Sequence, residues 1–336
     1  MNLSSRVASS DGPGRTRLAI AAVGIAVLAI SVAWLAWSAT RSPDTGPPEP
    51  DGPVPSPLAG AIPRFDHVYV VVLENHSYKE VVGDPAAPYL NRLIARGGLA
   101  TGWYGLARPS QPNYLALFAG ETLNVHDNLN HDFNERTIAD QLEDAGLTWR
   151  VFAENVPPGC YTGETAHDGP DGSGTYARKH EPAISFRQIS GNPARCANIT
   201  DFSHFTTGAA SFNLIMPNMC HDMHDCSVAA GDTFLAGFIP RIVDAPGWGP
   251  NDLLVITFDE GHTGDQHIST IVVSDWVEPG FRSAVRHDHY SLLRTLEAGW
   301  GLGCLANACT ANDIAEFFAR TAPSSPSSSP SSSSSP

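Results

Sequence analysis

Hydrophobic residues follow two patterns along the middle of the chain, one typical of strands and one typical of helices. Residues 65–73 form a nearly continuous run of apolar, largely β-branched side chains, which predicts a strand buried on both faces. Residues 88–96 repeat their apolar side chains at helical spacing before two glycines, which predicts a helix that ends there. By the same criteria we predict strands over 99–104, 148–153, 212–216, 253–258 and 270–274, and helices over 138–145, 233–243 and 290–300.

The predicted elements alternate between strand and helix. This order predicts an α/β fold in which helices cover a mostly parallel sheet. In such folds the ligand site lies at the carboxyl ends of the strands. We therefore expect the residues that directly follow the strands to carry the chemistry.

The two ends of the chain differ in composition from this middle part. Residues 18–37 form an apolar run of 20 residues behind three arginines, long enough to cross a bilayer as a helix. A signal peptide and an uncleaved transmembrane anchor both fit residues 1–41, and both place the rest outside the cytoplasm, secreted or attached to the membrane. Residues 42–61 are rich in Pro, Gly and Asp and predict a linker, whereas 322–336 are almost wholly Ser and Pro and predict a disordered tail. The expected globular domain spans 62–321.

The charge of the chain is strongly negative. Its net charge is −15, and the residues after 41 carry −18, because the first 41 hold four Arg and one Asp. Such a surface repels polyanions, so we expect no nucleic-acid partner. One of the two lysines, Lys179, lies in the compact basic segment Arg178-Lys179-His180, for which an ordinary solvated turn is the simplest explanation on composition alone.

Six cysteines in an exported chain predict three disulfides. Proximity in sequence favours the pairs Cys220–Cys226 and Cys304–Cys309, which leaves Cys160–Cys196. This pairing is one of fifteen that the sequence allows. A metal site built from these cysteines is disfavoured, because no Cys-x-x-Cys occurs.

One segment combines a nucleophile with a helix N-terminus. In residues 108–120 a serine, Ser110, stands between two prolines at the start of an apolar run long enough for a short helix. Such a terminus attracts anions, and a serine there becomes a nucleophile if its pKa is lowered. The simpler alternative is that Ser110 only caps the helix.

Oxygen ligands follow two of the predicted strands. Glu74-Asn75 come directly after the first strand, and Asp259-Glu260 come directly after residues 253–258. Buried carboxylates repel one another unless a cation or raised pKa values offset the repulsion, and an oxygen-rich set suits a divalent metal ion of unknown identity. The alternative is a row of solvated helix caps.

Two further segments contribute histidines. Residues 217–226 follow a predicted strand, contain two histidines and two aspartates, and are closed by one of the favoured disulfides. A loop of this kind can hold side chains in a fixed geometry for phosphate contact or metal ligation. The segment His287-Asp288-His289 opens the last predicted helix and is a second candidate.

Together these motifs resemble the bacterial phosphoesterase family, which contains secreted acid phosphatases and phospholipases C within the alkaline-phosphatase-like superfamily. The chain is most similar to the acid phosphatases that act on phosphatidylinositol 3-phosphate. The resemblance implies a three-layer sandwich with a mostly parallel central sheet. The matching segments are VVVLENHSY (70–78), RPSQPNYLALFAG (108–120), YARKH (176–180), PNMCHDMHDC (217–226), VITFDEG (255–261) and HYSLLRTLE (289–297).

The resemblance also implies roles for individual residues. Ser110 is the implied nucleophile that accepts the phosphoryl group. His180 and His224 are implied to bind the phosphate oxygens or protonate the leaving alcohol, and Asn113 to touch the phosphoryl group. The implied metal ligands are Glu74, Asn75, Ser110, Asp259 and Glu260, and further candidates for substrate binding are Arg178, Lys179 and His289.

Two positions depart from the family pattern. Arg108 stands where the family usually has His before Pro-Ser, and His221 stands where it usually has Asn. The first departure bears on the recognition of the leaving group or substrate. Neither removes an implied metal ligand.

These observations predict an extracytoplasmic, metal-dependent phosphomonoesterase, an acid phosphatase that works through a phosphoserine intermediate. Its expected partner is a phosphorylated small molecule or lipid headgroup, with the membrane as a second partner if the N-terminal segment is retained. One alternative is phosphodiester cleavage of the phospholipase C type. Another is a non-catalytic, metal-stabilised surface binding protein.

Overall fold

The computed structural model describes residues 62–167 and 175–318. The predicted leader, linker and Ser/Pro tail lie outside these residues, as does the apolar segment 18–37. Within the described part of the chain, no helix has both the length and the apolar character that crossing a membrane requires.

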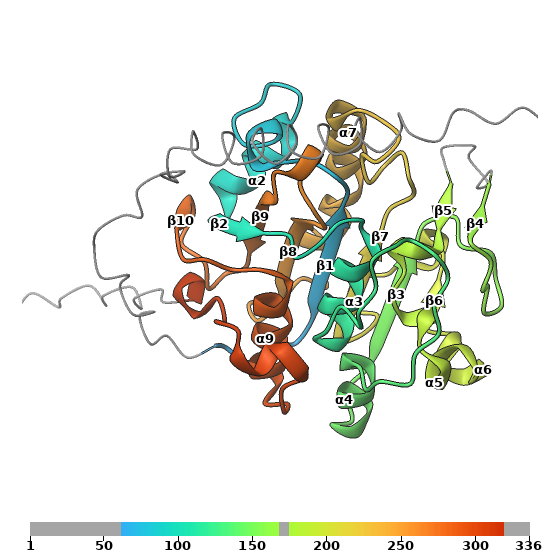
Figure 1. The fold of residues 1–336 in the computed structure, drawn as a ribbon. Coiled ribbons are helices and arrows are strands. Elements are labelled where there is room, and N and C mark those ends of the chain that lie inside the picture. The colour runs from blue at the N-terminus through green and yellow to red at the C-terminus, as the bar shows by residue number, and fades with distance from the viewer. Residues whose placement is uncertain (1–61, 168–174, 319–336) are drawn as a thin grey trace, which may run out of the picture. The chain divides into compact units, whose positions relative to one another are not determined.

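An eight-stranded sheet forms the centre of the fold, in the order β10-β2-β9-β8-β1-β7-β3-β6 (Figure 1). The earliest strand in the sequence, β1, lies between β7 and β8 and is parallel to both. A separate antiparallel pair is formed by β4 (Thr165–Ala166) and β5 (Tyr176–Ala177). The strands of the main sheet are β1 (Val68–Leu73), β2 (Gly98–Tyr104), β3 (Trp149–Ala153), β6 (Ile199–Thr200), β7 (Phe212–Met216), β8 (Leu253–Phe258), β9 (His267–Val273) and β10 (Phe281–Ser283).

The sheet is mostly parallel, as predicted. Strand β9 runs antiparallel to its neighbours β8 and β2, whereas the other pairings in the sheet are parallel. Every residue of β1 and of β8 is buried, which is the pattern of strands covered by helices on both faces. The continuous apolar runs in the sequence follow from this double burial.

Helices flank the sheet on its two faces (Figure 1). Helix α2 packs against α7, and α3 packs against α9 and α4. The α-helices are α2 (Pro88–Arg96), α3 (Gln111–Ala119), α4 (Ile138–Asp144), α5 (Arg187–Ser190), α6 (Pro193–Cys196), α7 (Val228–Phe238), α8 (Pro240–Val243) and α9 (His289–Trp300). Short 3₁₀ helices occupy Tyr78–Glu80, Arg178–His180, Ala183–Ser185, Phe202–His204, His262–Gly264, Ala306–Thr310 and Ala315–Phe318.

One predicted helix is wrong in its extent. The sequence favoured a single helix over 233–243, but the structure has α7 and then α8. Helix α7 begins earlier because the Ser227 side chain accepts a hydrogen bond from the Ala230 backbone N–H. It gives way to α8 at Pro240, which has no backbone N–H to continue the hydrogen-bond ladder.

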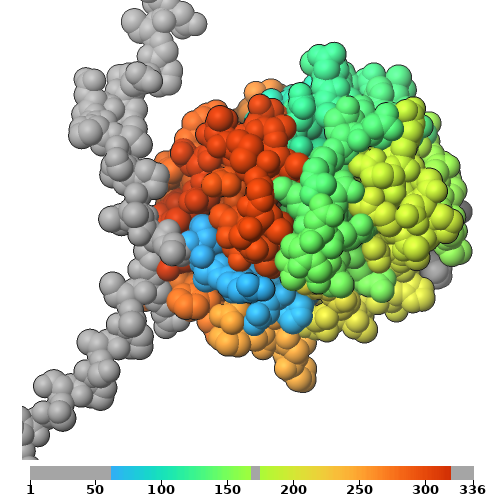
Figure 2. Space-filling model, turned by 90° about the horizontal axis from the view of Figure 1, so that it is seen from below, coloured from blue at the N-terminus to red at the C-terminus, as the bar shows by residue number. Residues whose placement is uncertain are grey.

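The first and last residues of the described domain pack together near the start of β1. Phe65, just before β1, packs edge-on against Trp300 at the end of α9 and lies 5.6 Å from the ring of Phe318. Figure 2 shows this face from below, with the start of the described chain in blue beside its end in red. The three disulfides are Cys160–Cys196, Cys220–Cys226 and Cys304–Cys309, which confirms the favoured pairing.

Candidate active site

Ser110 lies directly before α3, in the loop that follows β2. Its side chain makes no capping hydrogen bond to the helix. Instead the hydroxyl donates to Glu74 Oε2 at 3.0 Å and lies 3.4 Å from Glu260 Oε1. The hydroxyl is thus turned away from the helix and toward two buried carboxyl groups.

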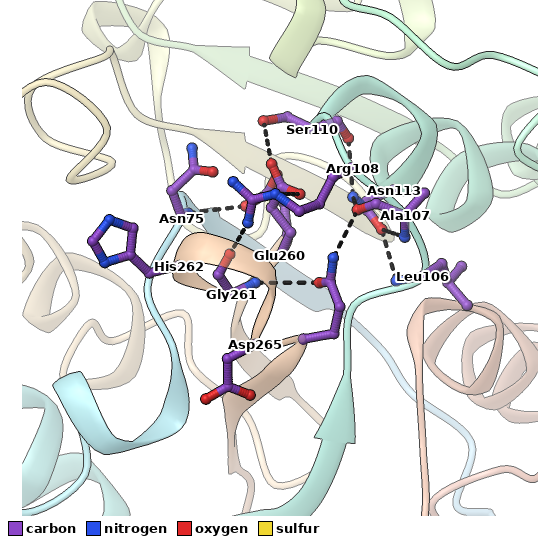
Figure 3. Close-up of polar contacts among 12 residues, drawn as sticks. Asn75, Leu106, Ala107, Arg108, Ser110, Asn113, Glu260, Gly261, His262 and Asp265 are labelled. Carbon is purple, nitrogen blue, oxygen red and sulfur yellow. Dashed lines mark hydrogen bonds and ion pairs between the residues drawn. The ribbon is translucent and has the colours of Figure 1, made fainter. Parts of the chain in front are cut away.

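The carboxyl ends of neighbouring strands bring those groups together. Glu74 follows β1, and Asp259 and Glu260 follow β8, its hydrogen-bonded neighbour. The Asn75 backbone N–H donates to Asp259 Oδ1 at 3.1 Å, and the Asn75 side-chain amide donates to Glu74 Oε2 at 2.7 Å. The five residues predicted as metal ligands therefore form one cluster in the structure, part of which is drawn in Figure 3.

This cluster concentrates negative charge in a buried place. Burial, followed by the neighbouring Asp259 and Asp222 carboxyls, raises the pKa of Glu74 well above its usual value. Burial and the adjacent Glu260 raise the pKa of Asp259 to about 7, and burial also raises the pKa of Glu260. The protein alone therefore does not compensate the charge of these carboxylates.

The donor set fits a divalent cation. Asp259 Oδ2 is buried and accepts no hydrogen bond from any described residue, and Glu260 Oε2 accepts none either, although it forms an ion pair with Arg108 Nε at 3.5 Å. A buried carboxylate oxygen without a donor, as at Asp259, close to a hydroxyl and an amide, matches the oxygen ligands that hard divalent ions take. A second compact group, Glu74 with His180 and His224, places one ligand atom from each residue within 4.8 Å of the others. Glu74 is common to both sets.

His180 is enclosed by two carboxyl groups. Its Nε2 lies 3.2 Å from Glu74 Oε1, and its Nδ1 lies 3.2 Å from Asp222 Oδ2. Its ring stacks on Tyr114, whose hydroxyl donates to Glu74 Oε1. Burial lowers the pKa of His180 well below its usual value.

His224 and Lys179 lie on the same side of the site. Lys179 Nζ is 3.1 Å from His224 Nε2, and His224 Nδ1 is 2.7 Å from Asp225 Oδ1. In the arrangement that satisfies both contacts, Nδ1 carries a proton toward the Asp225 carboxylate and Nε2 accepts from the ammonium group. The Lys179 ammonium group acts to lower the pKa of the Glu74 carboxyl, against the larger effect of burial.

Three predicted site residues are engaged with the surrounding protein. The buried Arg178 guanidinium donates to the carbonyls of Thr162 and His131 and pairs with Asp132. His289 Nε2 lies 2.6 Å from the backbone oxygen of Asp259. The His289 side chain therefore contacts the backbone of the segment that carries two of the predicted metal ligands. The third, Asn113, bonds the backbone of the loop that carries Ser110.

Sequence reasoning missed two residues of the cluster, Asp222 and Tyr114. Asp222 holds His180 through one oxygen and the His224 backbone N–H through the other, at 2.8 Å. It lies inside the 217–226 motif, from which the sequence prediction named His224 but not Asp222 as a site residue. Tyr114 comes four residues after Ser110, so the helical repeat places the two on the same face of α3, a signal that the sequence did contain.

Asn113 fixes the loop that carries the serine. Its Oδ1 accepts the backbone N–H groups of Leu106 and Ala107 at 2.9 and 3.1 Å, and its Nδ2 donates to the Ala107 carbonyl at 2.9 Å (Figure 3). We expect Asn113→Ala to destabilise the protein by about 3 kcal/mol, because it leaves these backbone groups without partners.

Urea denaturation measures this cost, with Asn251→Ala as control, since that amide makes only an exposed contact with Asp66. The control is expected to change stability by less than about 0.5 kcal/mol. A large loss of turnover in Asn113→Ala at unchanged stability would contradict the loop-fixing role and favour a direct contact with the phosphoryl group.

Comparisons with known sequences agree on one family. The profile of the phosphoesterase family matches residues 84–303. A phosphatidylinositol-3-phosphatase of Mycobacterium tuberculosis is 34% identical over 269 residues, which cover 76% of this chain and 85% of that protein. An acid phosphatase of Aspergillus fumigatus is 28% identical, over 81% of this chain and 62% of that protein.

Solved structures share the fold at low sequence identity. A protein of the alkaline phosphatase superfamily from Vibrio parahaemolyticus has a TM-score of 0.51 at 12% identity, over 76% of this chain and 71% of that one. A lipoteichoic acid synthase from Listeria monocytogenes has a TM-score of 0.54 at 10% identity, over 77% and 78%. The predicted α/β sandwich of the alkaline-phosphatase type is confirmed, and by sequence the chain belongs to the phosphoesterase family.

Proposed function

We propose that this protein is an extracytoplasmic, metal-dependent phosphomonoesterase that works through a phosphoserine at Ser110. The observation that carries the proposal is the direction of the Ser110 hydroxyl, which leaves its own helix uncapped and donates to Glu74 beside Glu260. A serine that served only as a cap would turn its oxygen to the helix backbone.

The chain's own groups supply the proton transfers of such a reaction. In the first step the Ser110 Oγ–P bond forms as the bond from phosphorus to the leaving oxygen breaks, and the hydroxyl proton passes to a contacting carboxylate. The leaving alkoxide takes a proton from the Lys179–His224 side of the site. In the second step water attacks phosphorus and gives a proton back to the Lys179–His224 side of the site, the Oγ–P bond breaks, the carboxyl group returns its proton to Ser110 Oγ, and inorganic phosphate leaves.

The oxygen set Glu74, Asn75, Ser110, Asp259 and Glu260 would hold the cation. A divalent ion bound there lowers the pKa of the serine hydroxyl and neutralises charge on the phosphoryl group. His180 and His224 would face the phosphoryl oxygens, and Asp222 contacts the ring of the first and the backbone N–H of the second. The start of α3, directly after Ser110, contributes the positive end of the helix dipole but no free backbone N–H, because those of Gln111 and Asn113 bond Asn128 and Ser110 and Pro112 has none.

The names of the relatives support a phosphorylated small molecule or a lipid headgroup as substrate, because they include acid phosphatases and a phosphatidylinositol-3-phosphatase. The three disulfides support a location outside the cytoplasm, where such bonds persist. The domain boundary at residue 62 and the N-terminal segment as signal peptide or anchor remain part of this proposal.

A paired assay tests the function. We expect the full chain to hydrolyse 4-nitrophenyl phosphate, to lose that activity in excess chelator, and to regain it when a divalent ion is restored. The matched diester, bis(4-nitrophenyl) phosphate, is expected to react at least tenfold more slowly. Faster cleavage of the diester would favour the phospholipase C type of chemistry, and no turnover of either ester would favour a binding protein.

A further inference from the structure

Arg108 lies at the rim of the site, two residues before the serine. Its side chain is 39% exposed, its Nε is 3.5 Å from Glu260 Oε2, and its Nη1 donates to the Gly261 carbonyl. Figure 3 shows the guanidinium beside Glu260 and above Gly261. The remaining terminal nitrogen, Nη2, makes no hydrogen bond with the described residues.

The Glu260 carboxylate separates this guanidinium from the serine. Glu260 meets Arg108 through Oε2 and lies 3.4 Å from the Ser110 hydroxyl through Oε1. The Ser110 hydroxyl contacts Glu74 and Glu260 but not Arg108, so the guanidinium lies one contact further out than the serine. It can contact a group that extends outward from the phosphoryl position toward solvent.

The site also has a second cation, Lys179. Lys179 Nζ contacts His224, whereas Arg108 pairs with Glu260. The two cations thus contact different residues of the site, in a domain that carries a large net negative charge. The phosphoryl group requires the positive charge of Lys179. The exposed Arg108 is then available to a different part of the substrate.

We propose that Arg108 determines specificity by binding a second anionic group on the leaving alcohol of the substrate, either a carboxylate or a phosphate. This inference rests on the proposed function. A guanidinium offers two parallel N–H donors that match either anion, and a half-exposed position lets it do so without being buried alone. The preferred substrates are then phosphomonoesters whose alcohol carries another negative charge a few bonds from the scissile phosphate.

Two substrates that differ at a single group test the inference. Glycerol 2-phosphate and 2-phosphoglycerate share the same scissile ester, but one hydroxymethyl group of the first is a carboxylate in the second. The measured quantity is the ratio of kcat/KM for 2-phosphoglycerate to that for glycerol 2-phosphate, from released phosphate. We expect this ratio to exceed one in the unmodified protein.

In Arg108→Gln the ratio is expected to fall at least tenfold, and in Arg108→Lys, which keeps the charge but loses the fork, it should fall less. Arg92→Gln is the matched control, because it removes the same charge from an exposed arginine on α2 that packs over the ring of Tyr89. The control should keep the ratio of the unmodified protein.

An unchanged ratio in Arg108→Gln, whatever the absolute rates, would overturn the inference and leave Arg108 as a brace for Glu260. If the glutamine variant does not fold, the same kcat/KM ratio is measured at pH 8 for the unmodified protein, Arg108→Lys and Arg108→His. An equal ratio in all three proteins would also overturn the inference. Should the unmodified protein release phosphate from neither compound nor from 4-nitrophenyl phosphate, the proposed function fails, and this inference fails with it.

Discussion

Ser110→Ala is expected to lower kcat by several powers of ten while the fold stays intact. The substitution removes one buried hydroxyl that donates to Glu74, so its effect on stability should be about 1 kcal/mol. Loss of the atom that we propose accepts the phosphoryl group should have a far larger effect on the rate. Steady-state kinetics on 4-nitrophenyl phosphate and a thermal melt of the same preparation separate the two effects.

Ser269→Ala provides the matched control. Ser269 is also a buried serine, on β9, but its hydroxyl has no hydrogen-bond partner in the described structure. Its removal should leave both kcat and Tm close to those of the unmodified protein. A Ser110→Ala protein that retained more than about a tenth of the original kcat, a barrier change below about 1.4 kcal/mol, would refute Ser110 as the nucleophile.

Asp259→Asn should lose activity for a different reason, because it should bind the cation more weakly. The amide keeps an oxygen that can accept the Asn75 N–H but loses the charge that offsets a divalent ion. We expect the ion concentration for half-maximal activity to rise about 100-fold or more, with partial recovery of kcat in excess metal. Titration of activity with the ion after chelator treatment measures this shift.

The melting temperature in chelator gives an independent readout. Replacing Asp259 relieves repulsion in the buried cluster, so the chelated variant should melt at or above the temperature of the chelated original protein. Added metal should then raise its Tm less than that of the original. Asp66→Asn, an exposed change remote from the cluster, should reproduce the original titration. Equal metal dependence in Asp259→Asn and Asp66→Asn would remove Asp259 from the proposed ligand set.

Much of the fold could be predicted because its central strands are buried on both faces. Such strands need apolar side chains at every position, and residues 212–216 and 253–258 coincide with β7 and β8. The order of strands in the sheet could not be predicted, since the neighbours of β1 lie far from it in sequence. The antiparallel direction of β9 also leaves no mark on a continuous apolar run.

The candidate site was predictable to the extent that it depends on strand ends. Glu74 and Asp259 come directly after apolar runs, so a shared edge of the sheet followed from the fold class. Contacts made by side chains across the fold were not predictable. Nothing in the local pattern at Arg178 shows that Asp132 and two carbonyls hold it, or that Asp222 reaches back to His180.

The central place of β1 has a consequence for how the protein is made. Its two partners, β7 and β8, are synthesised more than a hundred residues later, and the contact of Asn75 with Asp259 spans 184 positions. One edge of β1 therefore stays unpaired until residues 212–216 are available and the other until residues 253–258 are, so folding waits for these distant contacts. A product that stops before Leu253 contains the serine but none of the carboxylates after β8. We therefore expect activity to require a chain that extends past β8, and premature termination before Leu253 to abolish it.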